Sequence, residues 1–263
     1  MFGALDRWSK IAIALLAFAF ACLLVFWILL TVDSFRQTRK AEELLRALGN
    51  LELGTSSVPD ATSVVSTFGG MRVRYAETRG GVEPDCDVGE VYNIAITPHW
   101  IDQIKLKVPL ALRLGLVRDW SLNGAVHIKN GALTCVTYTI ILARRGPAVI
   151  FAGSLRPHSS WNHEERYSID FDPHPRGHAL VLRAYPDATA EQHAAVFRPD
   201  LHCLYSLWGC NYPCELSPSA WHAYLETAAW QHLVLGWGKP PDADDPRCGA
   251  TLAKAFHEKF SYI

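Results

Sequence analysis

The sequence lacks most of the features that identify an enzyme or a nucleic-acid-binding protein. Its 263 residues carry a formal net charge of −1 and form no basic stripe, so the electrostatic footprint of a nucleic-acid binder is missing. There is no Gly-x-Ser-x-Gly nucleophile elbow, no Gly-x-Gly-x-x-Gly fingerprint opening a helix and no Walker-type phosphate loop. We therefore expect no bound cofactor and no nucleic-acid partner.

Charge is missing altogether from residues 11–32, a run of 22 residues. At about 1.5 Å of rise per residue, a helix of this length covers a hydrocarbon core of about 30 Å. A soluble core helix would carry a polar face, and here only Thr31 offers a side-chain hydroxyl. The run predicts a single transmembrane helix with the lipid bilayer as its partner.

Two other interpretations of the run are a cleaved signal peptide and a lipidated cysteine. The apolar part of a signal peptide ends after about 7–15 residues, and this one continues beyond that length. Small residues at Ala19 and Ala21 precede Cys22, as in a lipoprotein, but lipidation there would leave an apolar start to the mature chain. Burial of Cys22 in the span is simpler.

The orientation of the span depends on two opposed signals. More basic residues follow the run than precede it, which by the positive-inside rule would place the large C-terminal part in the cytoplasm. Six of the seven cysteines also follow the run, and disulfides persist only in oxidising compartments. We favour the cysteine signal and predict an inner-membrane, single-pass protein with residues 1–10 in the cytoplasm and the C-terminal domain outside it.

The rest of the chain reads as an α+β protein. We expect a juxtamembrane helix over residues 33–50, a sheet domain over 51–188 and a helical, Cys-rich C-terminal extension over 189–263. Leu44, Leu45 and Leu48 share one face of the juxtamembrane helix, and Ser57 with Asp60 forms a capping box for a second, short helix.

From Met71 onward the apolar period changes from 3.6 to 2, which predicts strands. Asn130-Gly131 tolerates positive φ at both central turn positions and predicts a two-residue hairpin between strands 125–129 and 132–143. Short connections between the later strands predict an antiparallel sheet with helices packed on one face.

The six downstream cysteines are expected to staple this domain by disulfides. The sequence cannot choose among their pairings, but the preferred set joins Cys86 to Cys135 and leaves two bridges for the C-terminal group. The candidates are Cys86, Cys135, Cys203, Cys210, Cys214 and Cys248.

A helix, then Leu53-Gly54-Thr55-Ser56, a short helix with Val64-Val65 and a terminating glycine before a strand resemble the start of SmpA/BamE-type domains, over residues 48–75. That resemblance implies a two-layer α+β module that helps assemble or stabilise partners at the bacterial envelope. The Cys-rich stretch ahead of Pro218-Ser219-Ala220-Trp221 is similar to uncharacterised bacterial single-pass membrane proteins, and this second likeness implies no activity.

The candidate metal ligands are histidines in one segment, because zinc sites need three or four converging ligands. Their spacing argues against a site, since Pro175 and Gly177 break any helix between the last two and no His-Glu-x-x-His occurs. The candidates are His158, His163, His174 and His178.

Two functional hypotheses follow. The preferred one is a membrane-anchored extracytoplasmic binding or structural module with an envelope protein as partner and no catalytic residues. Its candidate binding surface is aromatic: Trp161, Trp208 and Tyr212. The alternative is a metal-dependent hydrolase that uses the segment from His158 to His178.

Overall fold

The structure is a computed structural model that describes residues 2–73, 86, 89–98, 119–143, 148–158, 166–174, 177–205, 210, 213–221, 223 and 224. The elements, in chain order, are α1 (Phe2–Gly49), α2 (Val58–Thr67), β1 (Met71–Val73), β2 (Glu90–Ile96), β3 (Asp119–Lys129), β4 (Ala132–Ala143), β5 (Ala148–Leu155), β6 (Tyr167–His174), β7 (Gly177–Ala184), α5 (Ala190–Phe197), η2 (His202–Leu204) and η3 (Pro213–Glu215).

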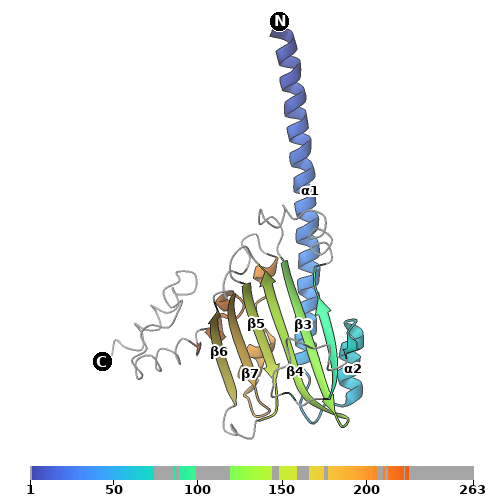
Figure 1. The fold of residues 1–263 in the computed structure, drawn as a ribbon, viewed down its shortest axis with the longest axis vertical. Coiled ribbons are helices and arrows are strands. Elements are labelled where there is room, and N and C mark those ends of the chain that lie inside the picture. Colours follow the sequence, from blue (N-terminus) through green and yellow to red (C-terminus); the bar gives the residue numbers. More distant parts are fainter. Residues whose placement is uncertain are drawn as a thin grey trace, which may run out of the picture.

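The longest element, α1, runs without interruption from the N-terminal region into the folded domain (Figure 1). The part of α1 from Ser9 onward is long and apolar enough to cross a membrane, and its most apolar window is not buried in the protein. Its last turns have a buried face that repeats every three or four residues: Ser34, Thr38, Ala41, Leu44, Leu45 and Leu48. The predicted helix after the apolar run is therefore confirmed, and it is a core helix of the domain.

The described strands form one seven-stranded mixed sheet in the order β1-β2-β3-β4-β5-β7-β6. Consecutive strands from β1 to β5 pair antiparallel, and so do β6 and β7. The prediction of a wholly antiparallel sheet is wrong at one place, because β7 inserts between β5 and β6 and pairs parallel to β5. After β5 the chain skips one position and forms the edge strand β6, and β7 then fills the position between them. Strands β5 and β6 are therefore consecutive in sequence but are not neighbours in the sheet.

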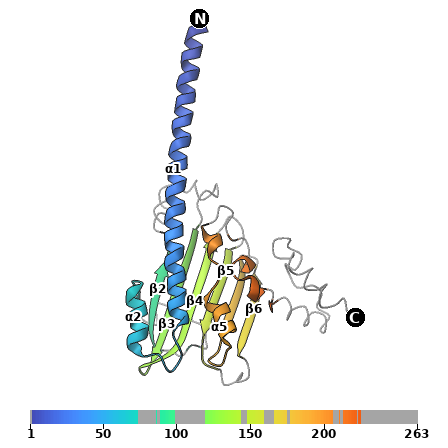
Figure 2. The same ribbon diagram turned by 180° about the vertical axis from the view of Figure 1, so that it is seen from behind.

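All of the described helices cover the same face of this sheet, with α1 and α5 over its middle and α2 toward the β1 edge (Figure 2). Strand residues alternate accordingly. On β3, Trp120, Leu122 and Val126 point into this helical layer and are buried, while Asn123 on the other face is exposed. Packing helices on one face was the expectation, and it holds for the described elements.

The strand β3 is longer than the predicted 125–129, since it begins at Asp119. Gly124 lies within it because α1 crosses there: a Cβ on Gly124 would come 3.2 Å from a methyl of Leu48 and 3.7 Å from Leu44. The predicted hairpin that follows is confirmed, with φ of 53° at Asn130 and 76° at Gly131.

The entry of α1 into the domain is fixed by a buried serine. Ser34 Oγ donates a hydrogen bond to the carbonyl oxygen of Leu204 at 3.2 Å and accepts one from Trp120 Nε1 at 3.2 Å. One hydroxyl thus joins α1, the start of β3 and η2 at the end of the sheet where the apolar part of α1 emerges.

Five of the six downstream cysteines are described, and four of them form two pairs at disulfide distance. Cys86 lies at disulfide distance from Cys135, with 5.7 Å between Cα atoms, which matches the preferred pairing. Cys203 and Cys210 form the second such pair at 4.9 Å, and Cys214 is also disulfide-bonded. Cys248 lies outside the described residues, and Cys22 is free and exposed on α1.

One hydrophobic core contains residues from all three predicted divisions. Leu48 of α1, Tyr138 of β4 and Phe197 of α5 belong to the same buried cluster. This buried cluster therefore includes residues on both sides of positions 50 and 188, and the division into domains stays a prediction.

Candidate functional site

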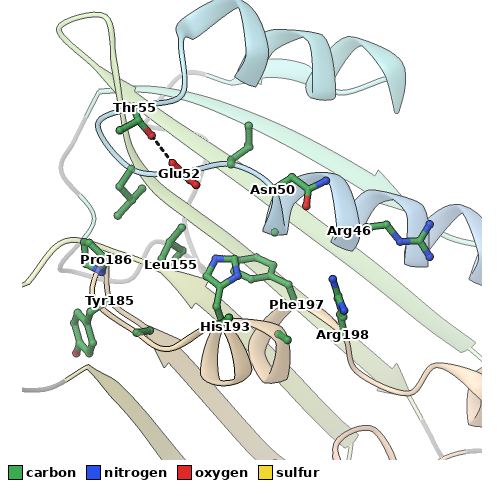
Figure 3. A pocket seen from close by; sticks show the side chains of 16 residues that line it. Arg46, Asn50, Glu52, Thr55, Leu155, Tyr185, Pro186, His193, Phe197 and Arg198 are labelled. Carbon is green, nitrogen blue, oxygen red and sulfur yellow. Dashed lines mark hydrogen bonds between the residues drawn. The ribbon is translucent and has the colours of Figure 1, made fainter.

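A pocket of about 820 Å³ lies where α1 ends, far from the apolar part of the helix (Figure 3). Its walls come from the end of α1, the loop that follows it, the end of β5, the segment after β7, and α5. The lining residues are Arg46, Gly49, Asn50, Leu51, Glu52, Leu53, Thr55, Leu155, Tyr185, Pro186, Ala188, Ala190, His193, Ala194, Phe197 and Arg198.

The first wall is the loop over residues 50–57, which local hydrogen bonds hold in one shape. The Glu52 amide donates to Ser56 Oγ at 2.8 Å, and Thr55 Oγ1 donates to Glu52 Oε2 at 2.9 Å. Gly54 takes a φ of 76°, and its amide donates to the Leu133 carbonyl of β4 at 3.4 Å. The Ser57 and Asp60 capping box then starts α2 as predicted. The carboxylate of Glu52 is thereby held at the pocket.

The second wall is α5, which begins after a Thr189 and Gln192 capping box. Phe197 is buried against Gly49, where an added Cβ would come 2.8 Å from the Phe197 Cβ. Tyr138 of β4 donates its hydroxyl proton to the Val196 carbonyl, and its ring lies 5.8 Å from that of Phe197. These contacts fix α5 against the end of α1 and so set the width of the pocket.

Charges around the pocket are mainly positive. Arg46 and Arg198 are exposed, and Figure 3 places them toward one end of the pocket, with Glu52 and Thr55 toward the other. The His193 ring lies between these ends and packs on Phe197 with 5.0 Å between centroids. Burial, and next the charge of Arg198, hold the pKa of His193 below its ordinary value, while Glu52 opposes this shift.

The third wall, Tyr185, belongs to a polar cluster that includes one predicted metal ligand. His158 stacks on Tyr185 with 5.0 Å between centroids, and its Nε2 lies 2.9 Å from Asp187 Oδ1. Arg166 Nε contacts the other oxygen of Asp187 at 3.2 Å, and Arg156 donates to the Tyr185 hydroxyl at 3.3 Å. His158 therefore pairs with a carboxylate and an aromatic ring that shape the pocket wall.

The structure does not bring the predicted metal ligands together. The β5 and β7 register pairs Val149 with His178 and Leu155 with Ala184. The strand between Val149 and Leu155 is about 20 Å long, so His158 and His178 lie toward opposite ends of the sheet. His174 is the last residue of β6 and pairs with Gly177, next to His178, and His163 is outside the described residues. Among the residues that are described, no three His, Cys, Asp or Glu side chains form a group that could hold a metal ion.

The predicted aromatic surface cannot be placed, because Trp161, Trp208 and Tyr212 all lie outside the described residues. Sequence reasoning missed the pocket, whose residues come from three separate stretches around 46–55, 155 and 185–198. The available signals were local ones: the Gly49-Asn50 helix end and the arginine that closes the short helix at 190–197.

No protein-family model, no curated protein and no solved structure matches this chain.

Proposed function

We propose that the chain is a single-pass protein of the bacterial envelope that holds a disulfide-stapled α+β domain outside the cytoplasm, where the domain binds a partner. The observation that carries this proposal is α1 itself. The same uninterrupted helix presents exposed apolar side chains from Ile11 to Leu29 and then supplies buried ones, such as Leu44 and Leu48, to the core. An apolar helix surface with nothing covering it is what a bilayer accommodates.

The extracytoplasmic side is supported by the cysteines. Cys86 is almost fully buried next to Cys135, and Cys203 lies beside Cys210. Cysteine pairs at bonding distance remain oxidised outside the cytoplasm, where no thiol pool reduces them. The envelope as the place of action also agrees with the resemblance of residues 48–75 to SmpA/BamE-type domains.

Binding is supported by the pocket. Its volume lies in the range of about 300–1,000 Å³ that is usual for ligand sites, and it combines apolar side chains with a few polar groups. The walls are pinned by caps and buried contacts, so the shape exists before a ligand arrives.

The first test is topology. We expect C-terminal alkaline phosphatase fusions to be active and C-terminal green fluorescent protein fusions to be dark, with the chain resisting carbonate extraction from membranes. Thiol alkylation in intact cells should modify the downstream cysteines only after reduction. A soluble chain, or downstream thiols that react without reductant, would refute the proposal.

The second test is partner capture in living cells. A photo-crosslinking amino acid placed at Glu52 or Arg198, on the pocket rim, should give discrete adducts. The matched control is the same amino acid at Asn123, which is exposed on the opposite face of the sheet. Adducts at Asn123 alone would show that the partner binds the opposite face of the sheet and not the pocket. If no adducts formed at any of the three sites, the proposed binding role would be refuted.

A further inference from the structure

Two arginines from different elements line one end of the pocket, and Glu52 lies toward the other end (Figure 3). Arg46 lies in the last turn of α1, and Arg198 is the residue that ends α5. The contact between Phe197 and Gly49 brings these two elements together. Within the described part of the chain, the ion pairs involve other residues, and neither guanidinium has a carboxylate partner. Two cations at the same end of a pocket attract an anion.

The remainder of the pocket is much larger than a bare inorganic ion, since the volume is about 820 Å³. Leu51, Leu155 and Phe197 are buried in its walls, and the apolar surface left open comes from side chains such as Leu53, Pro186 and Ala194. Such a surface gains free energy when an apolar body covers it. The pocket therefore fits a ligand that has an anionic end and a hydrocarbon or aromatic body.

Glu52 sets the direction in which such a ligand enters. Its carboxylate accepts a hydrogen bond from Thr55 at 2.9 Å and lies toward the end of the pocket away from the arginines (Figure 3). A second anionic group there would be repelled. The ligand should carry its charge at the arginine end alone.

We propose that this pocket binds a small organic acid, with its single carboxylate at the end lined by Arg46 and Arg198 and its apolar body against the half-buried Leu53 and Ala194. This inference deepens the proposed binding function and depends on it only for the compartment that supplies the acid.

His193 provides an internal reporter of occupancy. It packs on Phe197, and the charged groups that act on it are Arg198 and Glu52. A carboxylate bound beside Arg198 offsets the arginine charge, so the pKa of His193 should rise when the site fills. Imidazole NMR signals of the full chain in phosphatidylcholine nanodiscs report this shift, and the His193→Asn variant assigns the signal.

The decisive experiment measures binding of 4-phenylbutyrate and of its neutral amide to the full chain in the same nanodiscs, with empty discs subtracted. We expect the acid to bind at least about tenfold more tightly than the amide, because hydrogen bonds to a charged group are worth about 1.5–3 kcal/mol. The Arg46→Gln/Arg198→Gln variant should lose at least about tenfold in affinity for the acid.

The matched control is Arg36→Gln/Lys40→Gln, which removes the same charge from exposed positions on α1 outside the pocket lining and should bind as the unmodified chain does. The Glu52→Gln variant should admit suberate, a diacid of similar length, which the unmodified chain excludes.

Equal binding of acid and amide, unchanged binding by the pocket variant, or no binding of either probe would overturn the inference. Inorganic phosphate that competes as well as 4-phenylbutyrate would also overturn it, since the apolar body would then contribute nothing. The topology fusions test the proposed function separately. If the domain is cytoplasmic but binds the acid, the proposed function is refuted and the acid-binding pocket stands. If the domain is extracytoplasmic but does not bind the acid, only the acid-binding pocket is refuted.

Discussion

Between residues 11 and 29 every side chain of α1 is exposed, whereas between residues 34 and 48 the same helix buries six side chains against the sheet. The backbone does not change across this boundary, and only the side chains do. The first part is apolar all round, and the second places charged residues opposite its buried face. Helix length therefore does not reveal whether a helix segment packs against protein or is left exposed. The distribution of polar side chains around the helix axis distinguishes the exposed segment from the segment that packs on the sheet.

The largest expected difference between the two parts comes from truncating a leucine in each. Leu48 is 0% exposed and packs over Gly124, so Leu48→Ala should lower the free energy of unfolding by about 2–5 kcal/mol. Leu23 is 62% exposed, and Leu23→Ala should change the free energy of unfolding by less than about 0.5 kcal/mol. Denaturant unfolding followed by near-ultraviolet circular dichroism measures both. Equal losses would show that the two parts do not differ in packing.

A second pair compares hydroxyl groups just inside and just outside the domain. Ser34→Ala removes the group that bonds both Leu204 and Trp120, and leaving buried partners unsatisfied should cost about 1–3 kcal/mol. Thr31 bonds only the Trp27 carbonyl of its own helix, so Thr31→Ala should cost less than about 0.5 kcal/mol. A double-mutant cycle of Ser34→Ala with Trp120→Phe should show coupling, and additive effects would argue against the shared hydrogen bond.

A third pair compares two phenylalanines of nearly equal exposure, Phe35 at 37% and Phe26 at 40%. Phe35 meets the Tyr205 ring edge-on at 5.1 Å and lies under the Arg39 guanidinium. Phe35→Ala should cost about 0.5–1.5 kcal/mol of domain stability, and Phe26→Ala should cost none of it. The same unfolding assay applies. A loss at Phe26 that matched the loss at Phe35 would mean that exposure alone sets the cost.

The smallest expected effect is a pH dependence confined to the domain, because residues 11–32 contain no acidic, basic or histidine side chain. Burial lowers the pKa of His127, which lies between Val91 and Cys135 on neighbouring strands. Below the unfolded-state pKa of about 6.5, the unfolded chain binds a proton at His127 more readily than the folded chain does. The free energy of unfolding therefore decreases as the pH falls from above about 6.5 toward the lower pKa of the folded state.

Thermal unfolding between pH 7.5 and pH 5 should therefore show a falling midpoint, and His127→Leu should flatten part of this slope. The control His202→Gln changes an exposed histidine and should leave the slope as it is. A midpoint that rises on acidification would contradict the burial argument.

Local sequence signals predicted local structure well. The Ser57 and Asp60 capping box and the Asn130-Gly131 turn have the predicted geometry, because each depends on residues that are neighbours in the chain. The pairing of Cys86 with Cys135 also agreed, although the sequence alone gave no geometric reason to prefer it.

Features that depend on contacts between distant residues were missed. Strand β3 begins at Asp119, six residues before the predicted start at Ala125, and its Gly124 leaves space for Leu44 and Leu48 of α1. The parallel pairing of β7 with β5 depends on where β6 lies, which no short-range signal encodes. The pocket combines Arg46 with Arg198, and only the folded chain makes them neighbours.

Residues 32–48 contain no glycine or proline, so this part of α1 has no residue that would kink the helix. With residues 11–32 in a bilayer, as proposed, the 17 residues from Asp33 to Gly49 place the pocket about 25 Å from the hydrocarbon core. A continuous helix, unlike a flexible linker, fixes the distance between the pocket and the membrane. A ligand must therefore reach the pocket at this distance from the bilayer.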